Sequence, residues 1–128
     1  MAVTLVNTSN VVDDATLRIA RAWDVTGAVV GGLPYLYVSG FQDSGISAFA
    51  ISITGQLTSV LGGGGNLQDD MALALGATSG LHTLAVGGNT LLYATGSSEG
   101  GLNAIRLDAA SGGMAPLAGA GGVFQRVR

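Results

Sequence analysis

The sequence predicts an all-β protein in which a unit of four short antiparallel strands occurs twice. The first observation is an internal repeat: residues 10–52 align without a gap with residues 66–108, at an offset of 56 positions (Gly31 to Gly87). The second is the alternation of polar and apolar side chains in short runs, which is typical of β-strands. The third is a content of 22 glycines in 128 residues, many of them paired between these runs. A fixed period of this size is typical of repeat architectures.

The first set of four predicted strands begins in the first repeat and ends at its border with the second. They cover residues 23–30, 35–39, 45–52 and 57–61. The Gly31-Gly32 pair between the first two strands predicts a tight hairpin turn. Residues 45–52 carry apolar side chains on both faces, as does a strand packed between two sheets. The corresponding predicted strands of the second repeat are residues 81–86, 91–95, 102–107 and 114–117.

The fourth, outer strand of the unit is predicted three times for two units. Residues 3–6 supply the first copy, and residues 57–61 and 114–117 supply the others. We therefore divide the chain into a first repeat at about 3–56, a second at about 57–113, and an extra outer strand at about 114–128. Because an unpaired edge strand is an aggregation hazard, residues 3–6 are predicted to pair outside these two units.

Four short strands about every fifty residues, separated by glycine turns, are typical of a β-propeller blade. One blade cannot bury both of its faces, so blades stack around an axis. Two blades do not close a ring, because propellers need about four to eight. The prediction is therefore a partial propeller, completed by other blades of a longer parent protein or by further copies in a homo-oligomer.

The charge content excludes several classes of partner. Charged residues make up 10% of the chain and the net charge is −3, so nucleic acid, whose phosphates require clustered Lys and Arg, is not an expected ligand. No apolar run approaches the roughly 20 residues of a membrane-spanning helix. There is no cysteine, which excludes disulfides and thiolate sites. Residues 1–7 lack the charged and apolar regions of a cleaved signal peptide.

Residues 31–60, with the sequence GGLPYLYVSGFQDSGISAFAISITGQLTSV, resemble the lactonase-like propeller repeats of secreted bacterial RTX (hemolysin-type) calcium-binding proteins. The similarity to the 6-phosphogluconolactonase propeller family is looser. Residues 87–117 resemble these repeats more weakly, because Glu99 stands in a turn that has lost its acidic pair and Arg106 enters the third strand. The resemblance implies a propeller in an exported or surface-associated bacterial protein, located outside the cell or at its surface without a cleaved N-terminal signal peptide.

Two pairs of aspartates occupy equivalent positions in the repeats and are candidate metal ligands. They are Asp13, Asp14, Asp69 and Asp70. Paired carboxylates with nearby carbonyl oxygens suit Ca²⁺, which takes six to eight oxygen ligands. The favoured alternative is structural, because an Asp in a loop commonly accepts hydrogen bonds from the backbone that follows it. The glycine run at residues 62–65 is not a calcium nonapeptide, since Leu67 stands where that motif needs Asp. We therefore expect no cofactor, with Ca²⁺ as the one ion that these residues suit.

Four other residues are candidate ligand-binding residues: Trp23, His82, Glu99 and Arg106. Trp23 has Ser79 as its counterpart in the second repeat and is therefore a candidate for sugar stacking. His82 is the only histidine, and no nucleophile motif accompanies it. With no catalytic residues assigned, the favoured function is a non-enzymatic structural or interaction module. The alternatives are a lactonase-type hydrolase and a carbohydrate-binding, lectin-like propeller.

Overall fold

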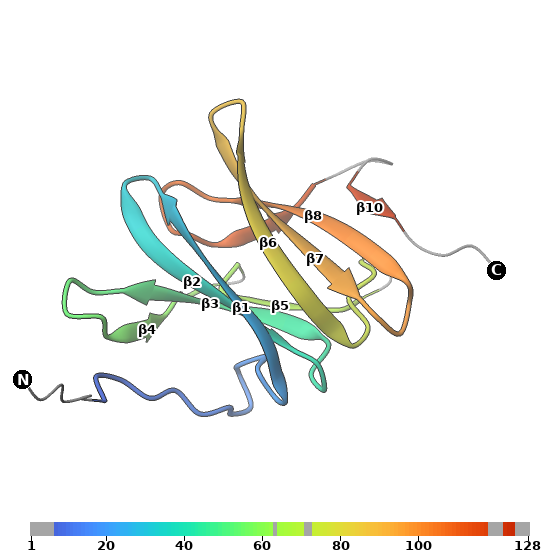
Figure 1. Ribbon diagram of the computed structural model, residues 1–128, viewed down its shortest axis with the longest axis horizontal. Coiled ribbons are helices and arrows are strands. Elements are labelled where there is room, and N and C mark those ends of the chain that lie inside the picture. Colours follow the sequence, from blue (N-terminus) through green and yellow to red (C-terminus); the bar gives the residue numbers. More distant parts are fainter. Residues whose placement is uncertain (1–6, 63, 71–72, 118–121, 125–128) are drawn as a thin grey trace, which may run out of the picture.

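The computed structural model describes residues 7–62, 64–70, 73–117 and 122–124, which form two antiparallel sheets (Figure 1). No helix occurs among these residues, so the all-β prediction is confirmed. It follows that none of them belongs to a helix long and apolar enough to cross a membrane. Residues 3–6, predicted as a surplus outer strand, lie outside the described residues.

Each sheet is a meander with an outer strand in two pieces. The first sheet contains β1 (Ala22–Val30), β2 (Leu33–Gly40), β3 (Gly45–Ile51), β4 (Leu57–Ser59) and β5 (Asn66–Gln68). The second contains β6 (Thr78–Val86), β7 (Asn89–Gly96), β8 (Gly101–Leu107), β9 (Met114–Pro116) and β10 (Val123–Phe124). β4 and β5 pair with opposite halves of β3, and β9 and β10 pair with β8 in the same way.

The sequence repeat is reproduced strand by strand. β1 begins at Ala22 and β6 at Thr78, which is the predicted offset of 56 positions. β4 begins at Leu57 and β9 at Met114, one position further apart, because one residue is inserted before the second outer strand. Both inner hairpins also carry a register shift near their first paired residue. The two meanders predicted from the sequence are therefore confirmed.

Glycine pairs make the two inner hairpins possible. Gly31 and Gly32 have φ values of 60° and 83°, and Gly87 and Gly88 have 57° and 83°. Two successive residues with positive φ form the type I′ turn, whose twist matches that of the strands it joins. L side chains disfavour this conformation, so the paired glycines fix where each hairpin reverses.

The glycine run at residues 62–65 stands between β4 and β5. It lies within the outer strand of the first sheet, because β5 follows it and pairs with β3. Val60 donates its N–H to the Ala48 carbonyl, and Ala48 donates its own N–H to the Gly65 carbonyl. A Cβ on Gly65 would overlap the Val60 carbonyl oxygen. The run therefore closes a tight loop that brings β5 back to β3.

Each sheet has two apolar faces, which we name after residues that recur in both repeats. The tyrosine face carries Tyr37 in the first sheet and Tyr93 in the second. The leucine face carries Leu36 in the first sheet and Leu92 in the second. Cross-strand pairing assigns the other members of each face, since directly paired residues share a face.

The core forms between unlike faces of the two sheets. The tyrosine face of the first sheet, with Tyr37 and Ile46, packs against the leucine face of the second, with Leu92 and Ile105. β1 and β6 lie side by side where the sheets meet (Figure 1). Among the described residues, the leucine face of the first sheet and the tyrosine face of the second are not covered by another sheet.

Candidate functional site

Three of the four aspartates predicted as metal ligands, Asp13, Asp14 and Asp69, accept hydrogen bonds from the chain that precedes each inner strand. Asp13 Oδ1 accepts the Ile19 N–H at 3.2 Å, and Asp69 Oδ1 accepts the Leu75 N–H at 2.8 Å. These two bonds are equivalent in the repeat. The described residues contain no group of three or more His, Cys, Asp or Glu side chains that could hold a metal ion. The carboxylates therefore act, in this structure, as anchors for the loops.

Asp14 belongs to the same loop and accepts two backbone hydrogen bonds. Its Oδ1 atom lies 2.8 Å from the Thr16 nitrogen and 2.9 Å from the Leu17 nitrogen. These donors, that of Leu17 above all, lower the pKa of Asp14, because they stabilise the ionised carboxylate. A charged Asp14 thus closes the turn that precedes the buried Leu17.

Asp69 lies beside Glu99 and is the acid whose pKa is raised. Burial raises the pKa of Asp69, and the neighbouring charges of Glu99 and Asp70 raise it further, although the Leu75 N–H acts in the opposite direction. Glu99 Oε2 accepts the Gly76 N–H at 2.7 Å. In the first repeat Asp43 makes the equivalent bond, to the Ala20 N–H at 2.9 Å. An acid with a raised pKa often marks a functional site, but Asp69, like Glu99, also holds a backbone N–H in place.

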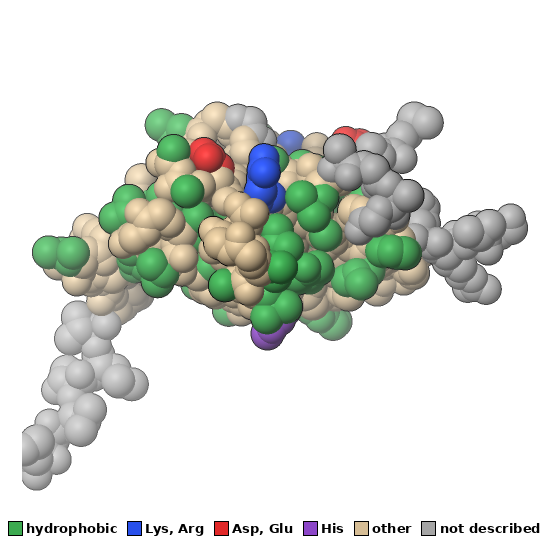
Figure 2. Space-filling view, turned by 90° about the horizontal axis from the view of Figure 1, so that it is seen from above, with side chains coloured by type: hydrophobic (Ala, Val, Ile, Leu, Met, Phe, Trp, Pro, Cys, Tyr) green, Lys and Arg blue, Asp and Glu red, His purple; other side chains and the backbone are tan. Residues whose placement is uncertain are grey.

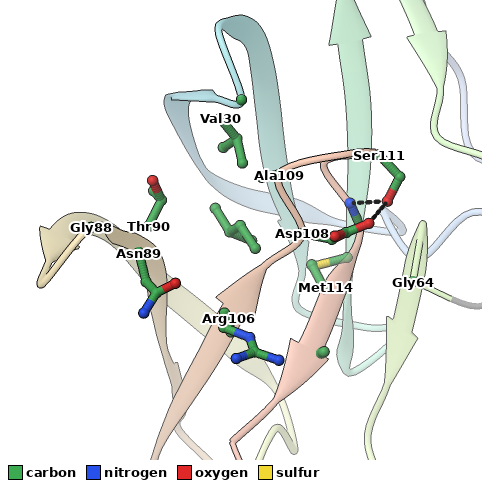
Figure 3. Close-up of a pocket in the computed structure, with 14 residues that line it drawn as sticks. Val30, Gly64, Gly88, Asn89, Thr90, Arg106, Asp108, Ala109, Ser111 and Met114 are labelled. Carbon is green, nitrogen blue, oxygen red and sulfur yellow. Dashed lines mark hydrogen bonds between the residues drawn. The ribbon is translucent and has the colours of Figure 1, made fainter.

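A cavity of about 580 Å³ opens where the hairpin turns approach the loop after β8 (Figure 3). Arg106 and Asn89 border it on one side, and Asp108 and Ser111 border it on the other. The Ser111 hydroxyl donates to Asp108 Oδ2 at 2.7 Å. This bond is the main cause that lowers the pKa of Asp108, and the Arg106 charge adds to it. The cavity thus offers one cation and one anion to a small polar molecule.

The four candidate ligand-binding residues do not converge. Trp23 lies in the register shift near the start of β1, and His82, opposite Tyr93 in β7, lies on the tyrosine face of the second sheet. Arg106 shares the face of His82 but borders the cavity, and Glu99 lies in the turn between β7 and β8.

Trp23 forms a small aromatic platform instead. It is 61% exposed, and its ring stacks on that of Phe41 with a centroid distance of 4.9 Å and an interplanar angle of 27°. The Arg21 guanidinium lies 5.8 Å from the Phe41 ring centre. The arrangement is that of two aromatic rings with a nearby cation, open to solvent on the side of Trp23.

Several polar groups that were not predicted from the sequence join the two sheets. Asp24 Oδ2 accepts the Leu81 N–H at 2.9 Å, and the Thr83 hydroxyl donates to the Gly27 carbonyl at 3.0 Å. The Tyr37 hydroxyl donates to the Gly112 carbonyl at 2.6 Å. Only the last had a signal in the sequence, because a tyrosine and a glycine recur at the matching positions.

The leucine face of the first sheet and the tyrosine face of the second both expose apolar side chains, although Phe49 on the leucine face is only 1% exposed. Val30 is 3% exposed in the packed tyrosine face, whereas its counterpart Val86 is 47% exposed in the open one. Ile46 and Leu102 differ in the same way, at 0% and 44%. Figure 2 shows hydrophobic side chains grouped on the viewed surface, with few charged side chains between them. Large contiguous apolar patches on a protein surface commonly belong to interaction sites, so these two faces are candidates for one.

Comparison of the chain with family models, curated proteins and solved structures finds no match.

Proposed function

We propose that this chain is a pair of β-propeller blades that serves as a non-enzymatic structural or interaction module of an exported or surface-associated bacterial protein. The observation that carries the proposal is the packing of unlike faces. The first sheet contributes its tyrosine face to the contact and the second contributes its leucine face, so each sheet keeps its other face for a further blade, as blades do when they stack around an axis. The resemblance of residues 31–60 to lactonase-like repeats of secreted proteins supports the location.

The distribution of reactive side chains supports a role without catalysis. A lactonase-type hydrolase would need a base and groups that stabilise developing charge, held together within hydrogen-bond reach of one substrate. Here His82 lies on an open sheet face, while Glu99 lies in a turn and accepts the Gly76 N–H. The perturbed Asp69 helps to hold the loop before β6.

A lactone hydrolysis assay tests the module against the hydrolase. The chain is incubated with a panel of sugar lactones, and the rate is compared with those of His82→Ala and Glu99→Gln. The proposal predicts that, with each of the three proteins, the lactones are hydrolysed at the uncatalysed rate. Turnover by the wild type that either substitution abolishes would overturn it.

Carbohydrate binding is a second candidate, favoured by the exposed platform of Trp23 on Phe41. Aromatic rings stack on the apolar faces of sugars, and the Arg21 guanidinium adds donors beside them. A glycan array read with the wild type and with Trp23→Ala tests it. Binding to particular glycans that Trp23→Ala loses would support this function, and equal signals from the two proteins would remove it.

A further inference from the structure

We propose that the open tyrosine face of the second sheet binds the open leucine face of the first sheet of another copy of this chain. This inference rests on the proposed function and names the partner that the module takes. Its basis is the interface that already exists within the chain, where a tyrosine face and a leucine face pack together. Each chain carries one open face of each kind, so the open tyrosine face of one copy can meet the open leucine face of another.

The apolar positions of the two interfaces correspond through the repeat. On the tyrosine face, the buried Val30 and Ile46 have Val86 and Leu102 as their counterparts. On the leucine face, the buried Leu92 and Ala94 have Leu36 and Val38, which are only half-buried. At these four positions a second copy would bury apolar residues in the same arrangement, whereas His82 and Arg106 stand on the open tyrosine face where the packed one has Thr26 and Ala50.

A loop contact in the existing interface supplies a more specific match. The loop between β8 and β9 packs on the first sheet so closely that a Cβ on Gly31 would overlap the Ala109 carbonyl oxygen. The Gly112 carbonyl in that loop accepts the Tyr37 hydroxyl at 2.6 Å. The loop between β8 and β9 thus contacts two positions of the tyrosine face, one glycine and one tyrosine.

The equivalent loop of the first sheet lies between β3 and β4. Among the described residues, it does not pack on a tyrosine face. Its Gly55 has φ 86°, close to the 72° of Gly112, and its Ile53 is fully exposed at the position of Ala109. On the open tyrosine face, Gly87 and Tyr93 stand where the first sheet has Gly31 and Tyr37. In the docked pair the Tyr93 hydroxyl donates to the Gly55 carbonyl of the other copy, and Ile53 packs beside Gly87.

Two polar links of the existing interface have no counterpart in the proposed one. Asp24, which accepts the Leu81 N–H, is replaced on the second sheet by Gly80, and Thr83 is replaced on the first sheet by Gly27. The contact between copies therefore has fewer hydrogen bonds than the contact within the chain. The contact between copies should accordingly be weaker than the packing of the two sheets within one chain.

Because the two docking faces differ, the contact is heterologous. Repeating it rotates each copy by the same angle, which closes a ring or extends a filament. Rings of about four to eight blades correspond to about two to four copies of a two-blade chain.

Sedimentation velocity over a wide concentration range tests the docking. The wild type should form species larger than a monomer as its concentration rises. Leu84→Glu places a charge on the open tyrosine face, and Val25→Glu places one on the open leucine face. Each substitution should weaken association by roughly tenfold or more, since a buried charge without a partner is costly. Val12→Glu is the matched control, because its counterpart Gln68 stays exposed beside the existing interface.

The outcomes separate docking from the proposed function. Far-UV circular dichroism first establishes that the variants keep their β-structure. A wild type that stays monomeric at every concentration overturns docking between copies, and so does an assembly that only one of the two variants weakens, because that result indicates an interface between like faces. Neither result affects the module, which fails instead if the lactone assay shows turnover that His82→Ala abolishes.

Discussion

Replacing Tyr37 with Phe removes a single hydroxyl from the centre of the contact between the sheets. The Tyr37 side chain is completely buried, and its hydroxyl makes a 2.6 Å hydrogen bond to the Gly112 carbonyl. Burial also raises the pKa of Tyr37 far above its ordinary value, so the hydroxyl is a donor throughout the usual pH range. The ring of Phe keeps the apolar contacts but leaves a buried carbonyl without this donor. The expected loss in the free energy of unfolding is about 1–2 kcal/mol.

Urea denaturation measures this loss, and Tyr93→Phe is the matched control. Both substitutions are made in the Leu84→Glu background, which the docking proposal expects to be monomeric. Tyr37→Phe should lower the urea midpoint with little change in the slope m. Tyr93→Phe should leave the midpoint nearly unchanged, because its face is open in the monomer. Equal effects of the two substitutions would refute the reasoning that distinguishes the packed face from the open one.

Three further substitutions test the account at separate points. Gly40→Ala would place a Cβ against the Arg18 carbonyl oxygen, so a loss of about 2 kcal/mol or more is expected in urea denaturation; an unchanged midpoint would contradict this contact. Asp24→Ala removes the acceptor of the Leu81 N–H and should speed amide hydrogen exchange at that residue by about tenfold, whereas unchanged exchange would show that the link does not hold the sheets together. Burial and neighbouring carboxylates raise the pKa of Asp69 above 3.8, so the stability that its neutral form supports is present below pH 3.8 and is lost as the pH rises through the folded-state pKa. Asp69→Asn should remove that part of the loss, and parallel stability curves for the variant and the wild type would argue against the raised pKa.

Much of the fold could be predicted because the determinants of each strand are local. Alternation assigns residues to faces, and paired glycines such as Gly31-Gly32 fix the hairpins through positive φ values. The repeat then transfers each assignment to the second sheet, as the offset between β1 and β6 shows. The loop position of the aspartates before each inner strand favoured a structural role over metal binding, and Asp13 and Asp69 accept equivalent backbone hydrogen bonds.

The pairing of faces could not be predicted, because both faces of each strand are apolar. Residues such as Ile46 and Phe49 lie on opposite sides of β3 and are both buried, so hydrophobicity does not show which side meets the second sheet. The linking groups were missed for a related reason. Asp24 and Thr83 each have a glycine as counterpart in the other repeat. Comparison of the two repeats therefore does not single them out. The return of β5 to β3 depends on backbone hydrogen bonds in a glycine loop, which have no side-chain signature.

The most direct measurement of the central claim mixes the two face variants, Leu84→Glu and Val25→Glu, and determines the mass of the product. Each variant alone lacks one working face and should remain monomeric. Together they retain one intact tyrosine face and one intact leucine face on different chains, so the account predicts a complex of one copy of each that does not grow further. If the mixture remains monomeric under conditions in which the wild type associates, the two faces do not bind each other and the claim is contradicted.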